Sequence, residues 1–266
     1  MYRGLIVPLV TPLEEGGVVS ERSVQTLVNS VRQEATALMP TLSSGEGWRL
    51  SEQQWRSMVT YTKAHACGLP VLAGIQLKDT LDVIARARMA MAMGVDAIVV
   101  TTPFCRDISQ DAIYEHYRAL RAEVGAPLFV YNEAAVSGNA IDLETLLRIC
   151  CMPGVVGIKE SSGSAKLIAQ LVAANTGVPV FQGWENLLLE SPGVDGYVLA
   201  LANLEPALCN AMLARPSAEL QARISAVCDQ HGLFRQDWYL WLKKELYRRE
   251  IIQSENVVDA ERRALS

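Results

Sequence analysis

One of the six lysines in the chain has a sequence context unlike the others. Lys159 ends the apolar run 155–158, whereas we interpret the segments around Lys63, Lys78, Lys166, Lys243 and Lys244 as exposed helix faces. Burial at the end of a strand disfavours an ammonium and lowers the pKa of a lysine. A neutral lysine can attack a carbonyl carbon and form a Schiff base. From this segment alone, a lysine that reaches past the strand end to solvent or pairs with Glu160 stays open.

A tyrosine and two serines follow other apolar runs. Tyr131 ends the run 127–131, where a phenol could move a proton to and from a carbonyl or carbinolamine oxygen. Ser43 and Ser44 precede Gly45, and hydroxyls with backbone N–H groups in such a turn can bind a carboxylate. Taken separately, the tyrosine could cap the core and the serines could form an ordinary turn.

These side chains can act together only if the ends of their strands meet. Short apolar runs begin about 20 to 35 residues apart, the length of a βα unit, at residues 4–10, 37–42, 70–75, 97–101, 127–132, 154–159, 178–183 and 196–201. We therefore expect a (β/α)8 TIM barrel with extra C-terminal helices, with its active site at the carboxyl ends of the strands. An open doubly wound sheet is the competing fold, but Ser43-Ser-Gly-Glu-Gly lacks the spacing of its usual phosphate loop.

Segments with helical periodicity separate the apolar runs. We expect helices over residues 20–34, 79–93, 109–123 and 142–151 and from Ser51, which opens a capping box, with Gly94 as a helix stop. Beyond residue 201 the pattern is helical through residue 249. We predict a barrel domain over residues 1–215 and a helical extension packed on it over residues 216–266.

Composition excludes several classes of function. The net charge is -5, and basic residues gather only in a short tail that contains Arg248, Arg249, Arg262 and Arg263, so we expect neither a nucleic-acid partner nor a membrane partner. No stretch approaches the roughly 20 apolar residues of a spanning helix, and no signal peptide is evident, which predicts a cytoplasmic protein. The cysteines form no CxxC pair and the histidines no HExxH motif, so we expect no metal and no cofactor.

At several points the sequence resembles the dihydrodipicolinate synthase and N-acetylneuraminate lyase superfamily of class I pyruvate aldolases. The resemblance covers residues 4–206, about three quarters of the chain. It rests on the order and spacing of Gly4-Leu-Ile-Val-Pro-Leu-Val-Thr-Pro-Leu, Ser43-Ser-Gly-Glu-Gly-Trp-Arg-Leu-Ser, Tyr131-Asn, Gly157-Ile-Lys-Glu-Ser, and Asn203 with Pro206.

The resemblance implies roles for four residues. Lys159 would form the Schiff base with the keto carbon of pyruvate or a longer 2-keto acid, and Tyr131 would be the proton relay. Ser43 and Ser44 match the pair that binds the substrate carboxylate. Proteins similar to this chain are commonly homotetramers built as pairs of dimers, which implies the same assembly here.

Two departures separate this chain from the synthases of that superfamily. The synthases carry an arginine after the Tyr-Asn pair to hold a second carboxylate, whereas residues 133–138 contain none. The tyrosine that a neighbouring subunit adds to their relay is matched here by Cys105, and a thiol differs from a phenol in size and hydrogen bonding. Both departures weigh against lysine biosynthesis. The Ser137-Gly138 pair and the run Gly45-Glu-Gly-Trp look more like the branch of neuraminate lyases and keto-deoxy sugar acid aldolases.

That branch suggests further substrate contacts. They come from the turn after the seventh strand, from Ser161 two residues beyond the lysine, and from three other positions; the candidates are Gly45, Ser137, Ser161, Gly183, Glu185, Asn186 and Leu199. Leu199 stands where a sugar-binding lyase would have a smaller or polar group, which argues against sialic acid itself. We expect Glu46 to be a structural carboxylate bonded to backbone amides.

The sequence therefore predicts a Schiff-base lyase or aldolase that acts on pyruvate or a 2-keto-3-deoxy acid. Three alternatives stay open: dihydrodipicolinate synthesis, dehydration of a keto-deoxy sugar acid on the same iminium chemistry, and a non-catalytic relative that binds a 2-keto acid.

Overall fold

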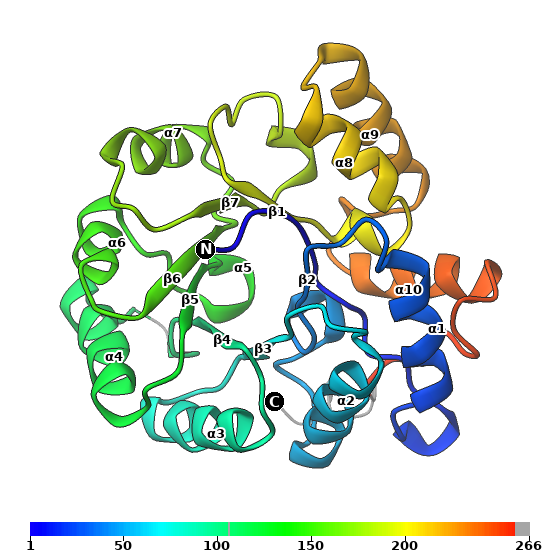
Figure 1. Ribbon diagram of the computed structural model, residues 1–266, viewed down its shortest axis with the longest axis horizontal. Coiled ribbons are helices and arrows are strands. Elements are labelled where there is room, and N and C mark those ends of the chain that lie inside the picture. The colour runs from blue at the N-terminus through cyan, green and yellow to red at the C-terminus, as the bar shows by residue number, and fades with distance from the viewer. Residues whose placement is uncertain (106, 259–266) are drawn as a thin grey trace.

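The fold is a closed barrel of eight parallel strands, described for residues 1–105 and 107–258 of a computed structural model (Figure 1). The strands are β1 (Gly4–Val7), β2 (Ala37–Leu38), β3 (Leu72–Ile75), β4 (Ala97–Thr101), β5 (Leu128–Asn132), β6 (Val155–Glu160), β7 (Val180–Gln182) and β8 (Gly196–Val198). They pair in the order β2-β1-β8-β7-β6-β5-β4-β3, and a parallel bridge between Leu38 and Val71 joins the two ends. The TIM barrel predicted from the sequence is confirmed.

Helices form a ring outside the strands (Figure 1). Those that alternate with the strands are α1 (Glu21–Val31), α2 (Glu52–His65), α3 (Thr80–Ala92), α4 (Gln110–Glu123), α6 (Leu143–Cys150), α7 (Ala165–Ala174) and α8 (Pro206–Ala214). Ser51 and Gln54 form the expected capping box at the start of α2, and Gly94 adopts a positive φ of 74° just beyond α3. Short helices occupy the loops as η1 (Glu15–Gly17), η2 (Ser43–Gly45), α5 (Ala134–Ser137), η3 (Glu185–Leu187) and η4 (Ala200–Asn203).

Several strands are shorter than the apolar runs that predicted them. Pro8 follows β1 and Pro40 follows β2, and a proline offers no N–H to a neighbouring strand. The apolar residues beyond β1 remain buried because Asn203 holds them, donating to the Pro8 carbonyl (2.9 Å) and accepting from the Val10 N–H (3.2 Å).

The interior of the barrel is filled by large side chains from alternate strand positions. Phe129 and Phe181 pack at 5.4 Å between ring centroids, inside a cluster that also contains Tyr131. Gly157 makes room for Phe129, since a Cβ at this glycine would lie 2.2 Å from the ring. The layer of side chains below the mouth is therefore aromatic and dry.

Two further helices, α9 (Ala218–Gln230) and α10 (Trp238–Arg248), follow the last barrel helix. Helix α9 contacts α8 and η3, and α10 contacts η2 and η4. Leu242 and Leu246 of α10 belong to the same buried cluster as Leu5 and Val7 of β1. Of the extension predicted over residues 216–266, residues 259–266 lie outside the described part.

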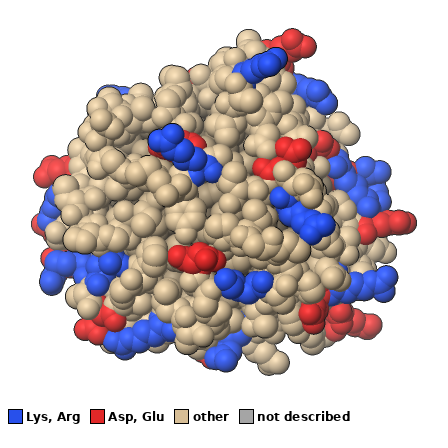
Figure 2. Space-filling view, viewed as in Figure 1, with Lys and Arg blue, Asp and Glu red and all other residues tan. Residues whose placement is uncertain are grey.

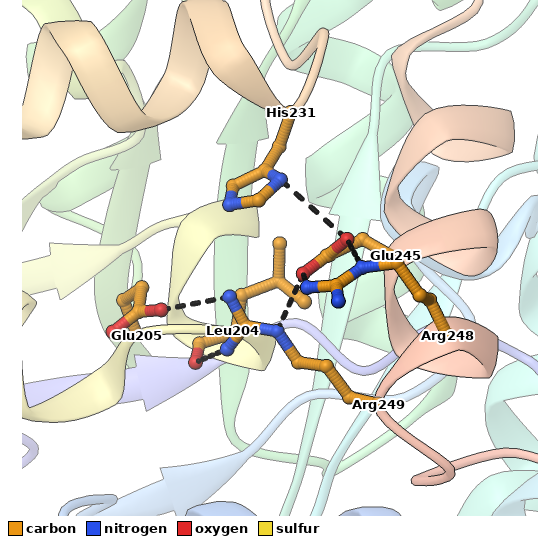
Figure 3. A network of polar contacts seen from close by, with 6 residues as sticks. All are labelled: Leu204, Glu205, His231, Glu245, Arg248 and Arg249. Carbon is orange, nitrogen blue, oxygen red and sulfur yellow. Dashed lines mark hydrogen bonds and ion pairs between the residues drawn. The ribbon is translucent and has the colours of Figure 1, made fainter.

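Glu245 ties α10 to the chain around it (Figure 3). It accepts hydrogen bonds from Arg248 (2.6 and 2.7 Å) and Arg249 (2.7 Å), and His231 lies 3.7 Å away. Arg249 also donates to the Leu204 carbonyl and binds Glu205, both at 2.9 Å. These arginines lower the pKa of Glu245 to about 2, so the stabilisation is complete above its ordinary value of 4.5 and is lost as pH falls toward 2.

A buried ion pair fixes the opposite face of α10. Lys243 Nζ lies 2.5 Å from Glu46 Oε1, both side chains are inaccessible to solvent, and Lys243 also donates to the Asn256 carbonyl. The second Glu46 oxygen accepts from the Val258 N–H at 2.9 Å. Glu46 is thus a structural carboxylate, as expected. The interpretation of Lys243 as an exposed lysine is wrong. The lysine is buried and forms an ion pair with Glu46, which lies 197 residues earlier in the chain.

Charged side chains of both signs are interspersed on the face shown in Figure 2, without a large patch of one sign. Within residues 1–105 and 107–258, no helix combines the length and apolar character needed to cross a membrane. The same residues contain no cluster of three or more His, Cys, Asp or Glu side chains suited to a metal ion.

The buried pair generates a prediction about stability. Replacing Lys243 with Met leaves the Glu46 carboxylate buried and unpaired, which should lower the free energy of unfolding by about 3–5 kcal/mol. Urea unfolding measures the loss. Lys244→Met is the matched control, because Lys244 is exposed one residue further along the same helix and its removal should cost within about 0.5 kcal/mol. Equal effects of the two substitutions would contradict the assignment.

Candidate active site

A cavity of about 1170 Å³ opens at the carboxyl ends of the strands. Most of the residues proposed from the sequence line it: Ser43, Ser44, Tyr131, Lys159, Ser161, Gly183 and Glu185. Residues 233–239 and Trp48 form another part of its wall. The barrel therefore brings side chains from five strand ends to one space, beside a segment from the C-terminal helices.

Lys159 lies at the centre of this arrangement. It pairs in register with Tyr131 of β5 and with Phe181 of β7, and its Nζ lies 4.1 Å from the centroid of the Tyr131 ring. Only 4% of the residue is exposed. Burial lowers the pKa of Lys159 from 10.5 to about 8, against the opposing effects of the Glu133 and Glu185 carboxylates. A substantial fraction of the amine is therefore neutral at mildly alkaline pH.

Hydrogen bonds join the ends of β5 and β6 next to Lys159. Asn132 donates to Glu160 Oε2 at 2.7 Å, and the Ser162 N–H donates to Glu160 Oε1 at 2.6 Å. Asn132 also accepts from the Ile141 N–H at 2.8 Å. Asn132 and Glu160 follow Tyr131 and Lys159 and point to the other side of the strands, so this network fixes the two inward side chains without occupying the cavity.

Tyr131 is held by hydrogen bonds to its hydroxyl. Burial, the largest effect, raises the pKa of Tyr131 well above its ordinary value, so the phenol is protonated. Its OH lies 3.4 Å from Ser43 Oγ, which accepts from Gln76 Nε2 at 3.1 Å. With Gln76 donating, the Ser43 hydrogen is available for the Tyr131 oxygen, and the Tyr131 proton is then available to a molecule in the cavity.

Ser43 and Ser44 form most of the short helix η2 after β2. Both are buried, and their turn closes with Gly45 N donating to the Leu42 carbonyl at 2.9 Å. Gly45 packs against the segment after β1, where Thr11 Oγ1 donates to its carbonyl at 2.8 Å. A Cβ at this position would lie 2.8 Å from the Leu9 carbonyl oxygen, so the close approach needs glycine.

The ends of β6 and β7 supply a second polar wall. Ser161 Oγ is buried and has no hydrogen-bond partner of good geometry among the described residues, although it lies close enough to Tyr131 to lower the pKa of the phenol. A Cβ at Gly183 would occupy the place of that oxygen. Glu185 accepts from the Leu201 N–H at 3.1 Å, and burial raises its pKa.

Glu133 is a site residue that the sequence analysis missed. It lines the cavity, accepts from the Val136 N–H at 3.0 and 3.1 Å, and so caps α5. Burial raises its pKa, while Lys159 lowers it. Its position two residues after Tyr131, just beyond a strand end, was the signal that could have identified it.

Other predicted residues lie outside the cavity wall as described. Leu199 is buried in the core, and the Ser137 hydroxyl donates to the backbone carbonyl of Glu133 within α5. Asn186 is exposed on η3, and Gly45 faces the segment after β1. Cys105, the position matched to a relay tyrosine, is exposed and does not line the cavity. The substrate contacts proposed for these residues stay predictions.

Comparison with known proteins identifies the family. The model of the dihydrodipicolinate synthetase family matches residues 1–256. The chain belongs to this family. A 4-hydroxy-tetrahydrodipicolinate synthase of Methylococcus capsulatus is 29% identical over 265 residues, covering 95% of this chain and 90% of that protein. Another, of Thermomicrobium roseum, is 31% identical over 237 residues, covering 87% and 77%.

A solved structure from the family has the same fold. Dihydrodipicolinate synthase from Bacteroides thetaiotaomicron superposes with a TM-score of 0.86 at 29% identity, covering 96% of this chain and 91% of that one. Membership in the family makes this protein an enzyme of the Schiff-base lyase and aldolase class. Its relatives are mostly synthases, so the preference for the sugar acid branch rests on the site residues alone.

The environment of Lys159 predicts how its reactivity depends on pH. Only the neutral amine reacts with acetic anhydride, so the rate of Lys159 acetylation should rise with pH and level off above about 8. Peptide mass spectrometry after trace labelling between pH 6 and 11 measures the inflection. Glu133→Gln removes a charge that stabilises the ammonium and should move the inflection to lower pH. An inflection near 10.5 in the unsubstituted protein would contradict this assignment.

Proposed function

We propose that this enzyme catalyses the reversible aldol cleavage of a 2-keto-3-deoxy acid to pyruvate and an aldehyde. One observation carries the proposal: the buried Lys159 amine, with its lowered pKa, lies 4.1 Å from the Tyr131 ring centroid in the same cavity as Ser43 and Ser44. These groups correspond to a nucleophile, a proton relay and a site for a carboxylate.

The reaction begins with attack on the keto carbon. The neutral Lys159 Nζ adds to C2 of the keto acid, and the carbonyl oxygen takes a proton from the Tyr131 hydroxyl. The Tyr131 phenolate then takes a proton from the carbinolamine nitrogen and returns it to the C2 hydroxyl group, which leaves as water as the nitrogen lone pair forms the iminium bond between Nζ and C2. Ser43 supports each transfer because it donates to the Tyr131 oxygen and so stabilises the phenolate formed when Tyr131 gives up its proton.

The iminium then draws electrons from the C3–C4 bond. A base takes the proton of the C4 hydroxyl group, the C3–C4 bond breaks, and the aldehyde leaves. The electron pair of the broken bond forms the C2–C3 double bond of an enamine. Protonation of C3 restores the iminium, and water releases pyruvate and the free lysine. Glu133 and Glu185, whose pKa values burial raises, are the carboxylates of the cavity wall available for this proton.

The carboxylate of the keto acid would rest on η2. The Ser44 hydroxyl lines the cavity and can donate to this carboxylate, whereas the single hydroxyl hydrogen of Ser43 is directed to Tyr131. A hydroxyl group binds a carboxylate without adding a positive charge that would lower the pKa of Lys159 further. Ser161, whose hydroxyl lacks a well-aligned partner in the described chain, is available for a hydroxyl group further along the substrate. This combination suits a polyhydroxylated acid.

A second candidate is 4-hydroxy-tetrahydrodipicolinate synthesis, which condenses pyruvate with aspartate semialdehyde. The relatives at 29 and 31% identity that carry this name favour it. Against it stand the segment 133–138, which contains no arginine, and Cys105, a thiol at the position matched to the relay tyrosine of the synthases. Assembly as a homotetramer also stays a prediction from the family resemblance.

Borohydride trapping tests the covalent step. Incubation with pyruvate and sodium borohydride should reduce the iminium and leave a stable adduct on Lys159, which peptide mass spectrometry locates. Lys159→Ala should remove the adduct and all turnover while the protein keeps its fold. Lys166→Ala, an exposed lysine seven residues further on, should behave like the unsubstituted protein. Turnover that survives Lys159→Ala would exclude the mechanism.

Product analysis separates the candidate reactions. Supplied with 2-keto-3-deoxygluconate, an aldolase releases pyruvate, whereas a dehydratase retains the full carbon skeleton; a synthase consumes aspartate semialdehyde with pyruvate instead. We expect pyruvate release. Tyr131→Phe keeps the ring beside Lys159 but removes the transferable proton, and should lower kcat by about 10²- to 10⁴-fold with a smaller effect on KM. An unchanged kcat would show that Tyr131 is not the relay.

A further inference from the structure

Arg49 brings an uncompensated positive charge to the cavity wall. Its Nη1 donates to the Tyr239 hydroxyl at 2.7 Å, and its guanidinium carbon lies 5.0 Å from the ring centroids of both Trp48 and Tyr239. Among the described residues, no ion pair involves this guanidinium. Aromatic faces attract a cation but do not neutralise it.

Three carboxylates line the cavity, and none of them forms an ion pair with Arg49 among the described residues; Asp237 lies on the segment 233–239, and the other two have backbone partners. Glu133 accepts from the backbone of α5, and Glu185 accepts from the Leu201 N–H. Both belong to the ends of β5 and β7, whereas Arg49 follows η2 and contacts α10. The cavity thus has two carboxylates near Lys159, and on another wall Arg49 lies with the segment that contains Arg235 and Asp237.

The guanidinium is held in place before any ligand arrives. The Arg49 N–H donates to the Glu46 carbonyl at 2.8 Å, and the Glu46 side chain is anchored by Lys243. Tyr239 and Lys243 are four residues apart on α10 and so lie on the same helix face. One face of α10 therefore positions both the backbone and the side chain of Arg49, which lowers the entropy lost when a ligand binds.

We propose that Arg49 binds a second carboxylate, at the end of the substrate remote from its 2-keto acid group. This inference rests on the proposed function, which places the 2-keto acid on Lys159. A guanidinium offers paired N–H groups that match the two oxygens of a carboxylate. One fixed arginine balances one negative charge, whereas a phosphate dianion would meet Glu133, Glu185 and Asp237 on the same cavity without a second fixed cation.

Two pairs of ligands test this subsite. 2-Oxoadipate and 2-oxohexanoate have the same number of carbons but differ in the distal carboxylate, and so do 2-oxoglutarate and 2-oxopentanoate. Calorimetry measures their binding without requiring a Schiff base. In the unsubstituted protein we expect at least one dicarboxylate to bind about tenfold more tightly or better than its partner. Arg49→Met should abolish this preference while leaving the borohydride adduct of pyruvate on Lys159.

Further variants keep the test decisive. Tyr239→Phe retains the ring and removes the hydrogen bond that orients the guanidinium, so it should weaken the preference several-fold even if Arg49→Met does not fold. Arg235 also lines the cavity but is exposed and stacks on Trp241 at 4.4 Å, so Arg235→Met should keep the preference.

The outcomes distinguish this inference from the proposed function. Equal binding of the matched ligands, or a preference that survives Arg49→Met but not Arg235→Met, would overturn the assignment to Arg49. A missing pyruvate adduct with the dicarboxylate preference intact would reject the aldolase mechanism and retain the anion site. A pyruvate adduct without the dicarboxylate preference would retain the Schiff-base step and reject the anion site at Arg49.

Discussion

The site depends on the burial of one amine at the end of a barrel strand. Lys159 pairs in register with Phe181 next to the apolar cluster inside the barrel, and burial lowers the pKa of the lysine to about 8. The neighbouring carboxylates Glu133 and Glu185 act in the opposite direction. Desolvation is the larger effect, so a neutral amine suited to the proposed nucleophilic role is available near pH 8.

Desolvation of this kind requires a closed mouth, which the barrel alone does not provide. Residues 233–239 form part of the cavity wall and are held because α10 is anchored on both sides, by the Glu46–Lys243 pair and by the arginines around Glu245. Removing one partner of such a buried pair leaves the other charge buried without its partner, which disfavours positions of α10 that separate Glu46 from Lys243. The C-terminal helices thus belong to the site as much as to the fold.

Local sequence signals predicted the fold and the centre of the site. Lys159, Tyr131 and Ser43 each follow an apolar run, and the carboxyl ends of parallel strands necessarily meet, so their proximity could be inferred without coordinates. Contacts between distant segments could not be inferred. Glu46 and Lys243 are 197 residues apart, and Arg49 and Tyr239 are 190 apart. Ser137 and Leu199 were proposed from family position and are not among the residues that line the cavity, so their substrate contacts stay predictions.

The family's chemistry and its specificity therefore reside in different parts of the cavity. The residues proposed to form the iminium are fixed by the register of the barrel, and this part is compatible with cleavage, dehydration or condensation alike. These reactions differ in the part of the substrate, or in the second substrate, that lies beside C3 and C4. That part contacts the loops after the strands. Residues 133–138 provide a carboxylate rather than an arginine, whereas the remote wall provides Arg49. Moving a fixed cation from one wall to the other changes which end of a substrate is held, and so changes which of its bonds lies over the iminium.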